Sequence, residues 1–72
     1  EDLPARQQTI LTKRELEVLN LITKGLPNAE AADLLGLSTN TVSVHIRNIY
    51  KKLRTNNRAE TIYEARSLGI IE

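Results

Sequence analysis

Apolar residues recur along the chain at the three- and four-residue spacing of amphipathic helices, and the alternation typical of strands is weak. The first such stretch opens with Thr12 and Glu15, whose separation fits a capping box at the start of a helix. Gly25 is well placed to end this helix in a left-handed conformation. The apolar face of the stretch contains Leu16, Val18, Leu19 and Ile22. We therefore predict a helix over about residues 13–24.

A second, shorter helix is predicted over about residues 28–35. Pro27 indicates its start, because proline lacks an N–H that the first turn would leave without a partner. The pattern does not decide whether Leu26 or Asn28 is the N-cap. Gly36 ends the helix, and its apolar face contains Ala31, Ala32 and Leu35.

The third predicted helix is the longest and covers about residues 39–53, with Ser38 as an N-cap by residue type. At about 100° per residue, four apolar positions fall within about 60° of one another and form a stripe for burial. These positions are Val42, Ile46, Ile49 and Leu53. The opposite side carries Asn40, Val44, Arg47 and Lys51, with Ser43 and Arg54 at its margins.

The fourth predicted helix covers about residues 58–68 and has two apolar edges. Asn57 and Glu60 resemble a second capping pair at its start, and Gly69 follows its end. One edge contains Thr61, Ala65 and Leu68, and the other contains Ala59, Ile62 and Tyr63. One of the two edges can pack on the domain, which leaves the other for a partner. The pattern thus predicts an all-α, four-helix domain over residues 11–72.

Size and composition exclude several classes of protein. At 72 residues the chain forms one domain at most, and its lack of cysteine excludes disulfides and thiolate chemistry. The single histidine, His45, is too little for a zinc cluster, so we expect no metal and no other cofactor. No apolar run reaches the length of a membrane span, and we expect a soluble, cytoplasmic protein. Residues 1–10 are polar and aperiodic, and we expect them to be a linker from a further N-terminal domain.

The charges are segregated along the chain. Residues 34–59 contain five basic residues and no acidic one, for a charge of +5. The other positions hold five basic and nine acidic residues, for −4, and the two parts sum to the net charge of +1. This separation creates a field that can attract a polyanion to one side of the domain.

The second and third predicted helices have the spacing of a helix-turn-helix. Ala32 is a small residue for the close approach of two helices, Gly36 suits the tight turn, and Val42 fills the contact from the second helix. An ordinary helical hairpin would share these features, and the outward side of the third helix favours DNA instead. Asparagine can read adenine, arginine can read guanine, and an apolar group suits the thymine methyl. We predict that the base-reading residues are Asn40, Ser43, Val44 and Arg47.

Other polar residues of this region are expected to hold phosphates, because they lie at helix starts, on helix flanks or beyond the reading positions. They are Asn28, Thr39, Thr41, His45, Lys51, Lys52, Arg54 and Arg58. His45 and Ser43 are two residues apart on a helix and point away from each other, so they cannot form a catalytic dyad. We find no nucleophile–base pair, phosphate loop or metal set and predict no enzyme. Only two aromatic residues are present, which favours duplex DNA over single strands that stack on aromatic side chains.

Several separated motifs carry a resemblance to a known family. Residues 11–19, LTKRELEVL, resemble the LTxRExEVL opening of the LuxR/NarL/FixJ/GerE family of DNA-binding domains. Residues 25–28 resemble its G-x-x-N motif. The remaining pattern is matched at residues 37–38, 41–45, 52–53 and 57–58. The chain departs from the pattern at Ser43, where lysine is common, at Ala31, where isoleucine is common, and at Pro27, which replaces the usual Ser or Thr cap.

The resemblance implies a four-helix output domain of a bacterial transcription regulator, often a two-component response regulator, with the third helix in the major groove. An upstream receiver or sensor domain would control DNA binding. Dimers of such families pair through the last helix, which implies a homodimer on an inverted or direct DNA repeat. The implied interface residues are Ala59, Ile62, Tyr63 and Arg66.

Two other functions share some of these features. A promoter-recognising domain of a sigma factor has a similar leucine-rich first helix and a helix-turn-helix, but it tends to be more basic in the third helix and lacks a dimerising fourth helix. A helical protein–protein interaction module would use its last helix without touching DNA. The acid-free span over residues 34–59 argues against the second alternative.

Overall fold

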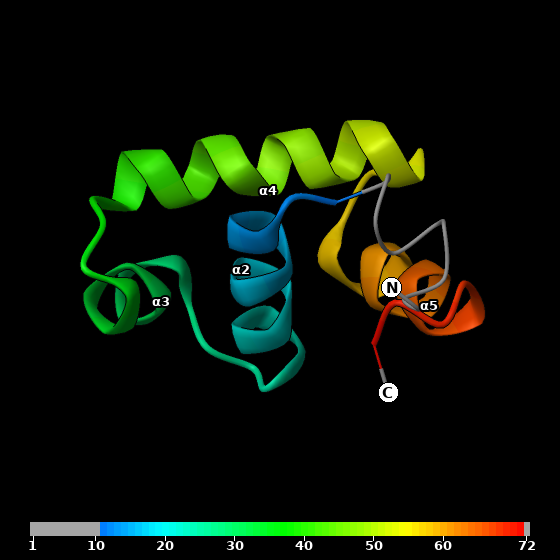
Figure 1. Cartoon of the computed structure of the whole chain (residues 1–72), viewed down its shortest axis with the longest axis horizontal. Coiled ribbons are helices and arrows are strands. Elements are labelled where there is room, and N and C mark those ends of the chain that lie inside the picture. The colour runs from blue at the N-terminus through cyan, green and yellow to red at the C-terminus, as the bar shows by residue number, and fades with distance from the viewer. Residues whose placement is uncertain (1–10, 72) are drawn as a thin grey trace.

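The computed structural model describes residues 11–71, and every regular element within that range is a helix. The helices are α2 (Lys13–Thr23), α3 (Asn28–Leu35), α4 (Thr39–Leu53) and α5 (Arg58–Ser67). The predicted all-α, four-helix fold is confirmed, and α2 and α5 each end one residue before their predicted limits. The predicted linker over residues 1–10 lies outside the described residues. In Figure 1, α4 runs along one side of the molecule, and α2, α3 and α5 lie side by side beneath it.

Capping bonds explain where α2 and α4 begin. The Thr12 hydroxyl accepts from the Glu15 N–H at 3.1 Å, and the Glu15 carboxylate accepts from the Thr12 N–H at 3.0 Å, which completes the predicted capping box. Ser38 caps α4 by accepting from the Thr41 N–H at 3.1 Å. Gly25 follows α2 with φ of 86°, the left-handed conformation predicted for it.

The start of α3 differs from both predicted alternatives, because the N-cap position is Pro27. The extended backbone of Pro27 places its carbonyl to accept the first helical bond, from the Ala31 N–H at 3.0 Å. Proline has no capping side chain, so α3 begins without a side-chain cap. Asn28 is the first helical residue, and its amide is free to make contacts elsewhere in the domain.

The start of α5 also differs in one detail from the predicted capping pair. Asn57 caps α5 by accepting from the Glu60 N–H at 2.9 Å. The Glu60 carboxylate does not return to Asn57, however, and accepts instead from the N–H of Asn56 at 2.8 Å. The two hydrogen bonds therefore stabilise both the first turn of α5 and the turn that precedes it.

One apolar core holds the four helices together. The predicted stripe of α4 lies in this core, which also receives Ala31 and Ala32 of α3 and most of the predicted face of α2. Leu16 differs from the other predicted residues of α2, because it is only partly buried at the edge of the core. The buried apolar residues are Leu11, Val18, Leu19, Ile22, Ala31, Ala32, Val42, Ile46, Ile49, Leu53, Ala65 and Ile70. Within residues 11–71, no helix is long and apolar enough to cross a membrane.

A charged residue, Glu15, lies among these apolar side chains and is only 4% exposed. Its carboxylate accepts from Lys52 Nζ at 2.8 Å, so an ion pair joins the first turn of α2 to the last turn of α4. Burial raises the pKa of Glu15, but the hydrogen bonds from Lys52 and the Thr12 N–H, with the charges of Lys52 and His45, outweigh burial. The pKa therefore lies below its ordinary value of 4.5.

We expect Glu15→Gln to lower the free energy of unfolding by about 1–2 kcal/mol near pH 7, because glutamine can retain the capping bond but loses the charge that pairs with Lys52. Since folding lowers the pKa of Glu15, the stabilisation is complete above the ordinary pKa and is lost as the pH falls through the folded value. Urea unfolding of both proteins, from neutral to acidic pH, measures the difference, which should shrink in acid.

A matched control for this prediction is Glu17→Gln. Glu17 pairs with Arg14 at 3.0 Å, but the side chains of that pair are 44% and 40% exposed, so water screens their charges. Its loss should change the free energy of unfolding by about 0.5 kcal/mol or less. A difference between wild type and Glu15→Gln that stays constant at every pH would contradict the role of the Glu15 charge.

Candidate nucleic-acid interface

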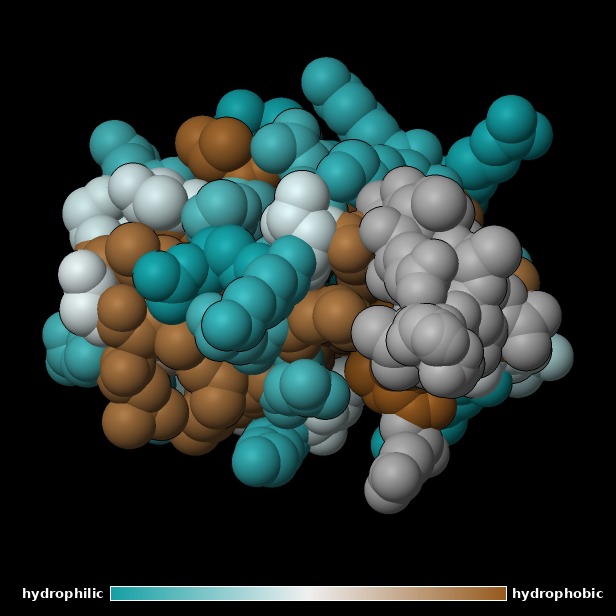
Figure 2. All heavy atoms as spheres, viewed as in Figure 1, coloured by the Kyte–Doolittle hydropathy of each residue, from teal (hydrophilic) through white to brown (hydrophobic). Residues whose placement is uncertain are grey.

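The outward side of α4 is a continuous polar and basic surface. Asn40, Arg47 and Lys51 are exposed, as predicted, and Val44 is 45% exposed among them. Ser43 is half-buried at the margin of this surface. Hydrophilic side chains project from the outer side of α4 in Figure 2. Because α4 contains no acidic residue, nothing on this helix cancels the charge of its outward side.

The turn between α3 and α4 determines the angle at which α4 is presented. Gly36 ends α3 with φ of 69°, and the Leu37 N–H donates to the Ala32 carbonyl at 2.9 Å. A Cβ built on Gly36 would meet no atom within 4 Å, so the positive φ, and not lack of space, requires glycine here. Ala32 and Val42 are buried on the two sides of the turn, in agreement with the predicted helix-turn-helix contact.

Small polar groups surround the N-terminus of α4. Thr39 and Thr41 are exposed, and the Thr41 hydroxyl shares a hydrogen bond of 2.9 Å with the Ser38 hydroxyl. His45 is half-buried one turn further along the helix. The first N–H groups of a helix have no intrahelical acceptor, so these hydroxyls flank a natural site for anions.

The cations near the C-terminal end of α4 differ in their surroundings. Lys51 and Arg54 are exposed, and no hydrogen bond or ion pair within residues 11–71 engages either side chain. Lys52, in contrast, is paired with Glu15. Arg54 is also the C-cap of α4, with φ of 58°, and it is the one non-glycine residue with positive φ in the described part of the chain. Its charged side chain is thus carried on a strained backbone.

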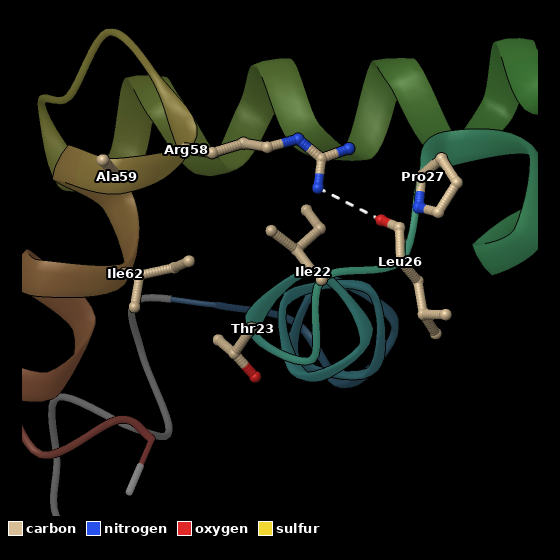
Figure 3. Close-up of a pocket in the computed structure, with 8 residues that line it drawn as sticks. Ile22, Thr23, Leu26, Pro27, Arg58, Ala59 and Ile62 are labelled. Carbon is tan, nitrogen blue, oxygen red and sulfur yellow. Dashed lines mark hydrogen bonds between the residues drawn. The ribbon is translucent and has the colours of Figure 1, made fainter.

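Arg58 and Asn28 form a bridge between the start of α5 and the margin of the outward side of α4. Arg58 donates from Nη1 to the Leu26 carbonyl at 3.2 Å and from Nη2 to Asn28 Oδ1. The Asn28 amide in turn donates from Nδ2 to Ser43 Oγ at 3.5 Å. Figure 3 shows the Arg58 side chain extending from α5 towards the Leu26 carbonyl. The sequence analysis predicted phosphate contacts for Asn28, Lys52 and Arg58, and no feature of the sequence indicated these contacts within the domain.

The outer edge of α5 remains exposed after the domain has folded. Tyr63 is 72% exposed, Ala59 and Arg66 are exposed, and Ile62 is partly buried against the core. A shallow and mostly apolar groove lies beside this edge, between α5, the end of α2 and the loop that precedes α3 (Figure 3). It is lined by Ile22, Thr23, Gly25, Leu26, Pro27, Arg58, Ala59 and Ile62.

Comparison with known proteins agrees with this architecture. Residues 9–65 match the profile GerE, described as bacterial regulatory proteins of the luxR family. The nitrate/nitrite response regulator protein NarP of Escherichia coli is 46% identical over 50 residues, which are 69% of this chain and 23% of NarP. The HTH-type transcriptional regulator MalT of Vibrio campbellii is 45% identical over 58 residues, 81% of this chain and 6% of MalT.

A solved structure has the same fold. The response regulator ChrA, of a heme-sensing two-component system, superposes with a TM-score of 0.83 at 35% sequence identity. The match covers 92% of this chain and 35% of ChrA. The chain therefore spans a quarter or less of NarP and MalT, and about a third of the solved ChrA chain.

Replacing the strained residue tests the backbone of this surface. Arg54→Gly should raise the free energy of unfolding by about 1 kcal/mol, because glycine adopts a positive φ without the steric penalty that arginine has. Thermal and urea unfolding measure the change. The matched control is Arg47→Gly in the middle of α4, which should lower the free energy of unfolding by about 1 kcal/mol. Destabilisation by both substitutions would contradict the strain at Arg54.

Proposed function

The chain belongs to the luxR family of bacterial regulatory proteins, and from this premise we propose that it binds duplex DNA sequence-specifically with α4 in the major groove. The family is one of transcription regulators with a helix-turn-helix that binds DNA, and it is not a family of enzymes. The observation that carries the proposal is the exposed, acid-free side of α4, whose opposite side is buried in the core. An α-helix fits the major groove, and a polar, cationic surface suits both the base edges and the phosphates that border the groove.

We propose that four residues of α4 contact base edges. Arg47 suits a guanine, whose O6 and N7 it can contact together, and Asn40 suits an adenine. Val44, at 45% exposure, supplies an apolar group for a thymine methyl. Ser43 completes the set from the margin of the surface, with a hydroxyl that can donate or accept.

Phosphate contacts are proposed for the polar residues around this reading surface. Lys51 and Arg54 are foremost, because their charges have no partner within residues 11–71. Thr39, Thr41 and His45 can add contacts near the N-terminus of α4. Asn28, Lys52 and Arg58 belong to the same set, but each already has a hydrogen-bond partner in the domain. We expect these three to contribute less to the salt dependence of binding than Lys51 and Arg54.

We also propose that the domain dimerises on DNA through the outer edge of α5. Ala59, Ile62, Tyr63 and Arg66 lie on this edge, and the exposure of Tyr63 leaves a large aromatic side chain without protein cover in the described residues. Aromatic residues and arginine are enriched at protein interfaces. The apolar groove adjoins the edge and extends the surface that a second copy could cover. An inverted or direct repeat in the DNA would match such a dimer.

The relatives suggest that this domain works within a longer regulator. NarP and ChrA are named response regulators, and the matched region is a minor part of each protein. We propose that an upstream domain, either a receiver or a small-ligand sensor, controls DNA binding by this one.

Substitutions on the reading surface separate base contacts from phosphate contacts. Arg47→Ala should cost about 1–3 kcal/mol of binding free energy and relax the preference at one base position. Lys51→Ala should weaken binding to all sequences alike and reduce the slope of log K against log salt concentration by about one unit. Titration of both variants against a selected site and a scrambled site, at several salt concentrations, measures the two effects. Identical behaviour of the two variants would refute the assignment of roles.

A negative charge introduced by substitution on the outer edge of α5 tests the proposed dimer interface. Ile62→Glu should weaken binding to a site with two half-sites by about tenfold or more, because the second copy no longer assists the first. Binding to a single half-site should be unchanged. Because Ile62 also packs partly against the core, Tyr63→Glu provides a second variant on a side chain that is 72% exposed. Sedimentation of either folded variant on DNA as an unchanged dimer would contradict the proposed interface.

A further inference from the structure

We propose that Arg58, acting through Asn28, fixes the Ser43 hydroxyl as a hydrogen-bond donor towards DNA and so selects a base that offers an acceptor. Arg58 and Asn28 are thus positioning residues for specificity, and Ser43 is the residue that contacts the base. The inference rests on the proposed function, because it requires α4 to lie in the major groove. It assigns a role to three side chains whose connection spans α3, α4 and α5.

The first step is the orientation of the Asn28 amide. A guanidinium has only donors, so the Asn28 atom that faces Arg58 must be the acceptor Oδ1. The second donor contact of Arg58, to the Leu26 carbonyl at 3.2 Å, holds the guanidinium in place. Asn28 and Arg58 are both half-buried, which limits competition from water for these bonds. The Asn28 amide therefore cannot turn over without losing the Arg58 bond.

The second step is the orientation of the Ser43 hydroxyl. With Oδ1 held by Arg58, Asn28 presents its NH₂ group to Ser43 Oγ, at 3.5 Å. An amide nitrogen does not accept hydrogen bonds, so the Ser43 oxygen accepts and its own hydrogen is left for another partner. No second hydrogen bond of this hydroxyl occurs within residues 11–71. Its O–H is therefore available to an acceptor on the DNA.

The third step is the chemistry of the major groove. Ser43 borders the exposed side of α4 between Asn40 and Arg47, which are proposed to read bases. A donor at this place matches the N7 and O6 atoms of guanine, the N7 of adenine or the O4 of thymine. Cytosine presents an amino group in the groove and would meet a donor with another donor. The bridge thus predicts that cytosine is disfavoured at the position that Ser43 contacts.

The decisive variant is Asn28→Asp. A carboxylate keeps the Arg58 contact and is favourable in the first turn of α3, so we expect the fold to be retained. The new carboxylate accepts from the Ser43 hydroxyl, which turns inward and leaves its oxygen as an acceptor towards DNA. The added negative charge weakens binding to every sequence, so the measurement is the relative affinity for the four bases at one position. We expect the discrimination against cytosine there to fall by about threefold to tenfold.

Three further variants make the test specific. Ser43→Ala identifies the base position in the DNA site that Ser43 contacts, because discrimination against cytosine should be lost there. In the Ser43→Ala background, Asn28→Asp should have no further effect on base preference. Arg58→Ala, which releases the Asn28 amide, should also relax the base preference at that position. Its matched control is Arg54→Ala, which removes an arginine charge without touching Asn28 and should lower affinity for all sequences equally. Thermal unfolding verifies that each variant is folded, and Asn28→Asp carries the test should Arg58→Ala not fold.

The possible outcomes separate this inference from the function on which it rests. A changed preference for Asn28→Asp that requires the Ser43 hydroxyl would support the bridge. An unchanged preference, or an equal change in the Ser43→Ala background, would overturn the bridge. An unchanged preference is the result expected where the Ser43 hydroxyl donates to a carbonyl of α4 itself and not to DNA. If the bridge is overturned but Arg47→Ala still relaxes the base preference at the position that Arg47 contacts, only the inference about the bridge has failed and the proposed function stands. Where Arg47→Ala also leaves every base preference unchanged, α4 does not read bases and the proposed function has failed.

Discussion

Burial of one stripe of α4 determines how this helix is rotated about its axis, and the rest of the surface follows from that rotation. Val42, Ile46, Ile49 and Leu53 all lie in the core, so the residues half a turn away must face outward. A rotation that hid Arg47 would expose this stripe and bury a charge. Each buried aliphatic side chain is worth about 1.5–3 kcal/mol relative to an exposed one, so the energetic preference for the observed rotation is large. The core thereby presents the polar side of α4 to the solvent.

The ends of α4 are fixed by polar contacts that the core alone does not supply. At one end, the Gly36 turn and the Ser38 cap set where the helix begins. At the other, the ion pair of Lys52 with Glu15 joins α4 to the first turn of α2. The basic residues of the acid-free span fall into two groups. Lys52 and Arg58 hold the domain together through contacts with Glu15, Leu26 and Asn28. The side chains of Arg47, Lys51 and Arg54 have no hydrogen-bond or ion-pair partner within residues 11–71.

The bridge from Arg58 to Ser43 gives the domain a physical connection between α5 and the outward side of α4. Arg58 is the first residue of α5, and the exposed edge of that helix begins at the next residue, Ala59. The apolar groove lies between the same residues and the end of α2. A partner that covers the edge of α5 would therefore sit against the side chain that orients Asn28. Dimer formation and base reading would then share one set of hydrogen bonds.

Local sequence patterns determined the secondary structure, the buried stripe and the helix-turn-helix, because these depend on the helical period and on capping over a few residues. The capping box of Thr12, the turn at Gly36 and the outward side of α4 were all predictable for this reason. Only the tertiary structure decided that Lys52 and Arg58 are paired within the domain, because their partners Glu15 and Asn28 lie 37 and 30 residues away in the chain. A basic residue looks the same in sequence whether its charge is free or paired, since pairing depends on which distant helix end the fold brings within hydrogen-bond reach.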